Sequence, residues 1–188
     1  MNYPKEKLDV LIDRLNWYLE NHTDILKTSM ANSLIFGSFH DPATMNEKIP
    51  ELVELCEWIG ITPETYQFIQ LRPAHAWPKG ADPIHVDPQS IARVLLPVRN
   101  CEGSINRFYD VPSYWFRETW SEVRQMVNYK NFYKGDYKEF PMTAEFELDD
   151  VYLFNISYPH GIWPNPKSTE QRITFTIFPN EDIAHLLG

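Results

Sequence analysis

Two histidines, one aspartate and one arginine are the residues of this chain whose types and order could support chemistry. His85-Val86-Asp87 form a triplet, His160 follows much later, and Arg172 comes after it. Two histidines and one carboxylate can occupy one face of an octahedral iron(II) ion and leave the opposite positions open. A guanidinium can hold the far carboxylate of an acidic cosubstrate through two parallel hydrogen bonds. These residues predict a catalytic metal site, provided that the fold brings them together.

The His-x-Asp triplet is weak evidence by itself, because the chain contains a second copy at His22-Thr23-Asp24. That copy follows an amphipathic pattern and precedes another apolar run, so we interpret Thr23 or Asp24 as a helix cap. The triplet at 85–87 instead lies near the end of a proline-rich stretch, residues 73–88, and directly precedes a strand pattern. Alternation at a strand end would direct His85 and Asp87 to the same side, which favours this triplet as the metal site.

Hydrophobic spacing predicts the elements that must position these residues. Apolar residues recur at helical spacing over residues 5–20 and again over 46–59, where Gly60 ends the pattern. After residue 63 the chain reads as short strands divided by turns, with a possible hairpin at 100–104 in which Gly103 supplies a permissive backbone. The predicted strands are 66–71, 91–98, 105–109, 144–148, 151–156 and 172–178, followed by a short helix at 181–187.

Helices first and strands after predict one α+β domain over residues 1–188, with a mainly β core of jelly-roll type and the helices packed on it. Residues 1–62 form the helical part and 63–188 the β-rich core. Residues 111–140 are dense in aromatic and basic side chains and are interpreted as an inserted helix and loop. On the last strand, Arg172 shares one face with Thr174 and Thr176, and this polar face needs either buried partners or an exposed sheet surface.

Composition excludes several classes of function. The chain has 188 residues, 43% of them hydrophobic, and a net charge of −9, which opposes binding to nucleic acids and to anionic membranes. The two cysteines, Cys56 and Cys101, are too few for a disulfide framework and are predicted to be free thiols. No secretory signal pattern and no apolar run of about 20 residues is present, so we expect a cytoplasmic protein. The sequence does not predict an oligomeric state.

Residues 85–109 and 153–177 resemble the iron(II)- and 2-oxoglutarate-dependent oxygenases. The resemblance is strongest to small phage and bacterial members related to aspartyl/asparaginyl and prolyl hydroxylases. It covers the chain from Pro83 onward and depends on the metal triad pattern, the Asn100-Cys-Glu-Gly turn and the Asn-x-x-x-Pro-His stretch at residues 155–160. The resemblance implies a double-stranded β-helix, also called a jelly-roll or cupin-like fold, with the metal at its open end.

By the same resemblance, His85, Asp87 and His160 would bind Fe(II), and the reaction would consume O2 and 2-oxoglutarate. Arg172 would pair with the distal carboxylate of 2-oxoglutarate, and Thr174 would assist from the same strand face. The substrate would be an amino acid, a peptide side chain or another small polar molecule, hydroxylated with release of succinate and CO2. The spacing between His160 and Arg172 is longer than the family pattern, which makes Lys167 a rival anchor.

Several alternatives stay open at the level of sequence. Arg93 and Asn155 are candidates for further cosubstrate contacts, but ordinary strand packing or turn bonding explains them equally well. The chain could instead be a cupin-like metalloprotein of different chemistry, or a non-catalytic barrel that binds a ligand. Four aromatic side chains could line a pocket or belong to the packed core: Trp77, Tyr109, Trp115 and Trp163.

Overall fold

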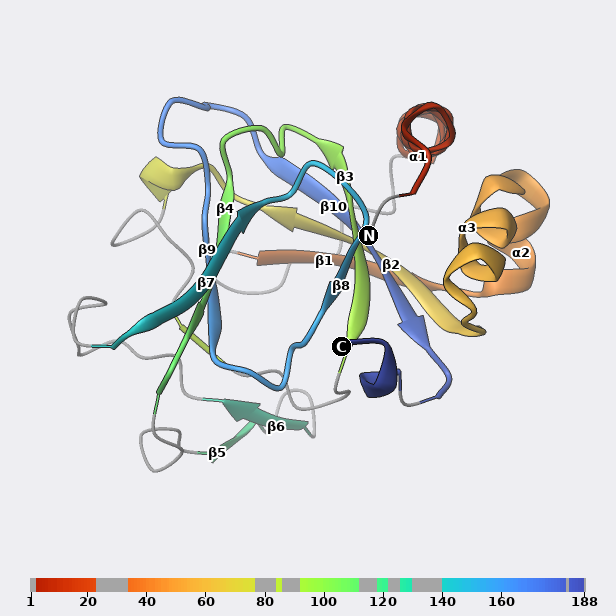
Figure 1. Ribbon diagram of the computed structural model, residues 1–188. Helices are drawn as coiled ribbons and strands as arrows, with labels where there is room; N and C mark the ends of the chain where they lie inside the picture. The colour runs from red at the N-terminus through yellow and green to blue at the C-terminus, as the bar shows by residue number, and fades with distance from the viewer. Residues whose placement is uncertain are drawn as a thin grey trace.

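The computed structural model of the protein describes residues 3–22, 34–76, 84–85, 92–111, 118–121, 126–129, 140–181 and 183–187. Helices lie on one side of a large sheet, and a small sheet faces its other side (Figure 1). The elements are α1 (Lys5–Asn21), β1 (Leu34–His40), α2 (Pro42–Lys48), α3 (Glu51–Ile59), β2 (Pro63–Leu71), β3 (Arg93–Arg99), β4 (Ile105–Tyr109), β5 (Glu118–Ser121), β6 (Met126–Tyr129), β7 (Met142–Glu147), β8 (Tyr152–Phe154), β9 (His160–Trp163) and β10 (Arg172–Pro179), with 3₁₀ turns at Ala74–Ala76 and Ala184–Leu187.

Among the residues that the structure describes, every strand pair is antiparallel. The large sheet has the order β1-β2-β10-β3-β8 and the small sheet the order β7-β4-β9, while β5 and β6 form a separate pair. From β3 onward the chain passes repeatedly between the two larger sheets, because β3, β8 and β10 lie in one and β4, β7 and β9 in the other. This alternation gives the two sheets a shared interior, and each return of the chain adds side chains to it.

α1 and α3 form where the apolar spacing predicts helices. Within the short helix predicted at residues 181–187, Ala184–Leu187 form a 3₁₀ turn. α1 buries Leu8, Leu11 and Leu15 on the stripe that faces the large sheet. The single helix predicted over residues 46–59 is wrong, because two helices, α2 and α3, meet at Pro50. Proline lacks the backbone N–H that a continuing helix needs and clashes with the preceding turn. α3 ends as predicted at Gly60, which adopts a φ of 81°.

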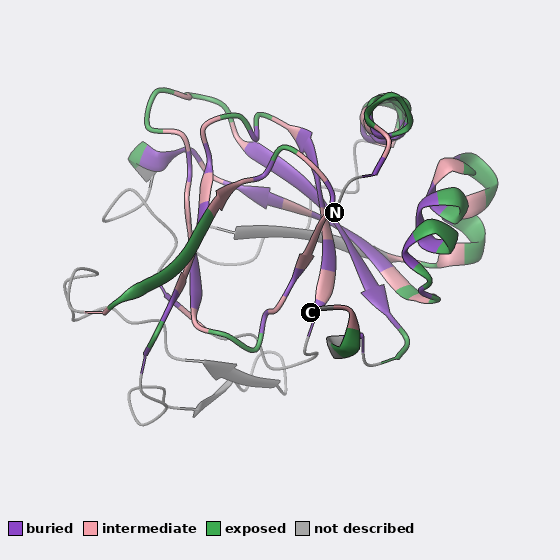
Figure 2. Ribbon diagram, in the orientation of Figure 1, coloured by how far each residue is buried: buried purple, intermediate pink, exposed green. Residues whose placement is uncertain are grey.

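The main hydrophobic core lies between the helices and the large sheet. It takes Ile173, Phe175 and Ile177 from β10, the apolar face that the sequence predicted. Every residue of β10 is buried, so the polar face of this strand also lies inside the protein (Figure 2). The alternative of a solvent-exposed polar face is therefore wrong, and Arg172 shares the interior between the sheets with Thr174 and Thr176.

The bounds of the predicted strands are confirmed to within a few residues, and three other features of the chain differ from the prediction. β1 and β9 were not predicted. Residues 118–121 and 126–129 pair as two antiparallel strands, so the helix expected within 111–140 is wrong for these residues. The predicted hairpin at residues 100–104 is wrong as well, because β3 and β4 do not pair and belong to different sheets. This segment is a turn that carries the chain from one sheet to the other, with Ser104 N bonded to Cys101 O at 3.0 Å.

Both cysteines are free thiols, as predicted, and both are buried. Burial raises the pKa of the Cys56 thiol to about 11, so its reactive thiolate is scarce at neutral pH. Cys101 donates to the carbonyl of Ile173 at 3.3 Å. In the part of the chain that the structure describes, every helix is too short or too polar to cross a membrane.

We expect Gly103→Ala to lower the free energy of unfolding by about 2–3 kcal/mol, because Gly103 has a φ of 68° and an added Cβ would lie 2.7 Å from Asn165 Nδ2. Gly60→Ala is the matched control, since Gly60 also has a positive φ but open space around it. Gly60→Ala should lower the free energy of unfolding by only about 1 kcal/mol, the cost of a positive φ in a residue that has a Cβ. Urea unfolding measures both, and equal losses would contradict a steric role for Asn165.

Candidate metal centre

His85 and His160, far apart in the chain, form one isolated antiparallel bridge. The His85 N–H donates to the His160 carbonyl at 2.8 Å, and the His160 N–H donates back at 2.9 Å. Their ring centroids lie 4.4 Å apart. The structure therefore brings together the two histidines that the sequence selected, although the third predicted ligand, Asp87, lies outside the described residues. Within those residues, no three His, Cys, Asp or Glu side chains form a group that could hold a metal ion.

The side chain of His160 is buried and held in one orientation. Its Nδ1 lies 2.8 Å from the carbonyl oxygen of Tyr158, and a carbonyl oxygen can only accept. Nδ1 therefore carries a hydrogen, and in the neutral ring Nε2 then has the lone pair. A backbone carbonyl that fixes the tautomer and orientation of a histidine is the usual support of a metal-ligating imidazole. The chemistry of this ring fits a metal ligand.

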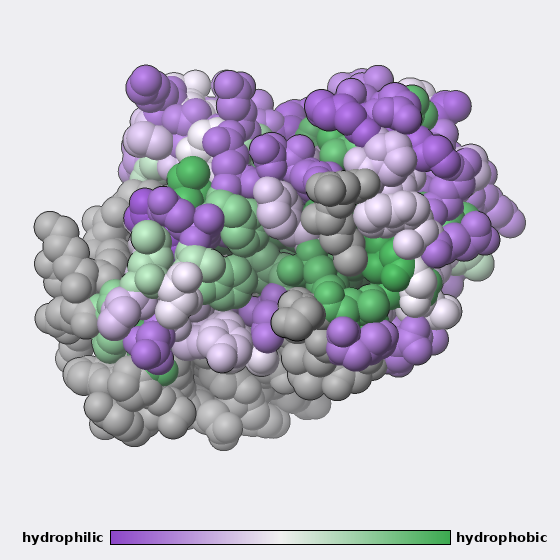
Figure 3. All heavy atoms as spheres, in the orientation of Figure 1, coloured by the Kyte–Doolittle hydropathy of each residue, from purple (hydrophilic) through white to green (hydrophobic). Residues whose placement is uncertain are grey.

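Aromatic rings line the interior beside His160. Phe154 lies 5.0 Å from the His160 ring and Phe108 lies 6.1 Å from it, between centroids. Phe146 and Tyr152 stack on each other at 4.2 Å and continue this wall. In the space-filling view, hydrophobic atoms cover the region between β7 and β8 (Figure 3). A wall of rings lowers the local access of water, which strengthens polar interactions made there.

These rings were not among those that the sequence analysis considered. Tyr109 and Trp163 pack together, with their ring centroids 5.8 Å apart, in a small hydrophobic cluster with Ile84. The hypothesis that they line the pocket is thus not supported by their contacts, which are those of packing. Trp77 and Trp115 lie outside the described residues. The sequence carries no clear signal for Phe108, because its place beside His160 depends on the register of β4 with β9.

Arg172 lies in the interior between the two sheets, with only 2% of its surface exposed. Its Nη2 donates to Oδ1 of Asn106, on β4 of the small sheet, at 3.4 Å. Thr174 lies on the same face of β10 and donates to the carbonyl of Ile69 at 3.5 Å. Lys167, the rival anchor, is exposed in the turn before β10. Of the two candidate cations, Arg172 is the one buried in the interior that also contains His160.

The described contacts of Arg93 and Asn155 are those of strand packing and turn bonding, the two alternatives to a cosubstrate contact. The Arg93 guanidinium lies over the Phe178 ring, with Cζ 4.5 Å from its centroid, and Arg93 is paired across the strands with Phe154. Asn155 Oδ1 accepts from the backbone N–H of Ser157 at 3.1 Å and from its hydroxyl at 2.7 Å. Strand packing explains the first residue and turn bonding the second.

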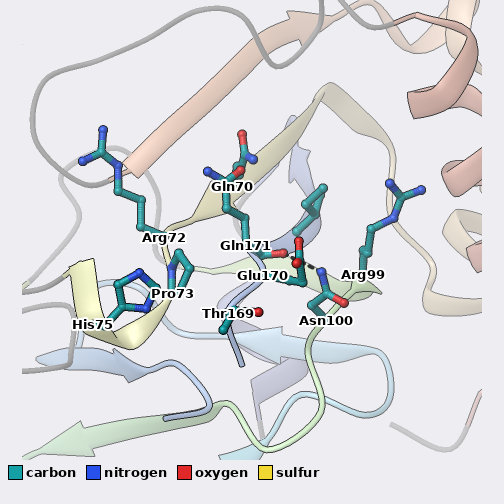
Figure 4. A pocket seen from close by; sticks show the side chains of 10 residues that line it. Gln70, Arg72, Pro73, His75, Arg99, Asn100, Thr169, Glu170 and Gln171 are labelled. Atoms are coloured by element: carbon teal, nitrogen blue, oxygen red, sulfur yellow. Dashed lines mark hydrogen bonds between the residues drawn. The ribbon is translucent and has the colours of Figure 1, made fainter. Parts of the chain in front are cut away.

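A separate open pocket of about 570 Å³ lies where β2 and β3 end and β10 begins (Figure 4). Its wall includes Gln70 and Ile173, which are cross-strand partners, together with Arg72 and Arg99. Asn100 donates to the carbonyl of Gln171 at its floor at 2.9 Å. Neither the two histidines nor Arg172 line this pocket, so it is distinct from the candidate metal centre.

No protein-family model matches the chain, and no curated protein matches it in sequence. Its fold is similar to that of the non-heme alpha ketoglutarate dependent carbocyclase SnoK from nogalamycin biosynthesis, with a TM-score of 0.54 at 12% identity over 98% of this chain and 83% of that one. Weaker likenesses are AviO1 from Streptomyces viridochromogenes Tue57 (15% identity, 97% and 86% covered, TM-score 0.48) and a Pseudomonas putida prolyl-4-hydroxylase (10%, 94% and 87%, 0.49). At these identities the comparisons show the fold alone.

We expect His160 to carry its hydrogen on Nδ1 at pH 8, because the Tyr158 carbonyl can only accept. Nitrogen-15 NMR of the histidine side chains distinguishes the two neutral tautomers, and His160→Gln identifies the signal. A neutral ring with its hydrogen on Nε2 would contradict the arrangement.

Proposed function

We propose that the protein is a non-haem Fe(II)- and 2-oxoglutarate-dependent oxygenase. The observation that carries this proposal is the pairing of His85 with His160 in an interior that also holds the buried guanidinium of Arg172. Asp87 follows His85 after one residue and would complete a set of two imidazoles and one carboxylate. The likeness in fold to SnoK and the alternation of strands between two sheets both support a double-stranded β-helix of jelly-roll type.

Each part of the interior has a separate task in this proposal. His85, Asp87 and His160 would hold the metal, with His160 oriented by its bond to the Tyr158 carbonyl. Arg172 would bind the distal carboxylate of 2-oxoglutarate, and Thr174 would add a hydroxyl from the same strand face. Bound Fe(II) supplies the activation of O2 that couples decarboxylation of 2-oxoglutarate to succinate and CO2 with oxidation of a substrate C–H bond.

The remaining residues orient and shield the reacting groups. Phe108 and Phe154 border His160 and would limit the entry of water to the metal. Arg93 packs next to Phe154 and would support this wall, while Asn155 would shape the turn that precedes His160. For the substrate we propose an amino acid, a peptide side chain or another small polar molecule, which is hydroxylated.

We expect the wild-type protein to bind Fe(II) without oxygen and to develop a weak visible charge-transfer band when 2-oxoglutarate is added. His85→Ala, Asp87→Ala and His160→Ala each remove a ligand and should abolish the band, because a site with two ligands holds Fe(II) much more weakly. His22→Ala is the control, since His22 belongs to the other His-x-Asp triplet. Loss of metal in His22→Ala but not in His85→Ala would mean that the wrong triplet was chosen.

We expect Arg172→Met to weaken 2-oxoglutarate binding by about 100-fold or more, since a charged two-point contact is lost. Lys167→Met should bind 2-oxoglutarate like the wild type, because Lys167 is exposed in a turn. Calorimetry on the Fe(II)-loaded, anaerobic proteins measures both affinities. The reverse pattern would transfer the anchor to Lys167.

A further inference from the structure

Asn106 is a fully buried polar residue at the centre of the interior. It lies on β4 between Phe146 of β7 and Ile162 of β9, and none of its surface is exposed. A buried carboxamide lowers stability unless its oxygen and nitrogen both find hydrogen-bond partners. Neither strand neighbour offers a polar side chain. The reason for an asparagine at this position must therefore come from its contacts across the interior.

The two ends of the Asn106 carboxamide have different surroundings. Its Oδ1 accepts from Nη2 of Arg172, and since a guanidinium can only donate, the oxygen must be the end that faces Arg172. The buried Nδ2 has no hydrogen-bond partner among the residues that the structure describes. The nitrogen thus presents a donor in a buried interior, beside the cationic donors of Arg172. Two such donor groups from facing sheets suit a carboxylate, which has several acceptor sites.

The position of Asn106 relative to the histidines also fits a ligand that reaches both. Phe108, two residues further along β4, is the strand partner of His160. Two residues of a strand cover about 7 Å, so Asn106 and the His160 position are offset by about the length of a small dicarboxylate. A 2-oxo acid at the histidine end would therefore bring its distal carboxylate toward the Asn106–Arg172 pair.

We propose that Asn106 binds the distal carboxylate of the 2-oxo acid through Nδ2 and positions Arg172 through Oδ1. This inference rests on the proposed function. It assigns the selection of a dicarboxylic 2-oxo acid to one residue from each sheet, Asn106 from β4 and Arg172 from β10. The bound cosubstrate then links the two sheets, and removing the amide donor weakens binding of only those ligands that have the distal carboxylate.

The test compares 2-oxoglutarate with 2-oxopentanoate, which has the same chain length and no distal carboxylate. Calorimetry with the anaerobic, Fe(II)-loaded protein should show that Asn106→Leu raises the Kd of 2-oxoglutarate by about 10- to 100-fold. The Kd of 2-oxopentanoate should stay unchanged. Asn16→Leu is the matched control, because Asn16 Oδ1 accepts from another arginine, Arg99, at 3.0 Å on the helix side of the large sheet. This control should bind both ligands like the wild type.

A second variant, Asn106→Asp, separates binding from folding. The new carboxylate pairs with Arg172 and competes with the ligand, so 2-oxoglutarate binding should be lost while the protein stays folded in thermal unfolding. Equal losses for both ligands in Asn106→Leu, or full 2-oxoglutarate affinity in either Asn106 variant, would overturn the inference. If the wild-type protein binds no 2-oxoglutarate at all, the proposed function fails instead.

Discussion

The rest of the structure depends on the burial of β10 on both faces. One face packs against the helices, through Phe175 and its neighbours, and the other closes the interior toward the small sheet. A charged side chain on a strand buried in this way is costly unless other groups compensate it inside the protein. Arg172 is such a side chain, and it lies opposite the carboxamide of Asn106. This constraint places the polar pair Arg172 and Asn106 in the interior between the sheets, while the helix side of the large sheet holds the main hydrophobic core.

The path of the chain explains how distant residues meet there. The chain crosses between the two larger sheets from β3 to β4 and again at each step from β7 to β10, so each crossing returns it to the same interior. β9 brings His160 back beside β4, and the bridge to His85 attaches the segment before β3 to the same edge. β10 then adds Arg172 from the opposite side. The candidate site thus combines residues from segments that lie far apart in the sequence.

Periodicity predicted much of this fold, and its failures have physical reasons. The apolar face of β10 and the end of α3 at Gly60 follow directly from spacing. β9 was missed because it is short and lies between Pro159 and Pro164, residues that usually mark turns. Asn106 was missed because the sequence of a five-residue strand does not show which of its faces is buried. That depends on how β4 pairs with β7 and β9. The candidate site residues were selected from their types and order, while the rings beside His160 could be identified only from the register of the strands.

Formation of succinate from 2-oxoglutarate in air, with Fe(II) and the purified protein, tests the central claim most directly. If the interior binds iron and the 2-oxo acid together, the wild-type protein should produce succinate, even without substrate, at a slow uncoupled rate. His160→Ala should produce none above the rate of free Fe(II). Succinate formation by the wild-type protein that equals that of His160→Ala would contradict the account.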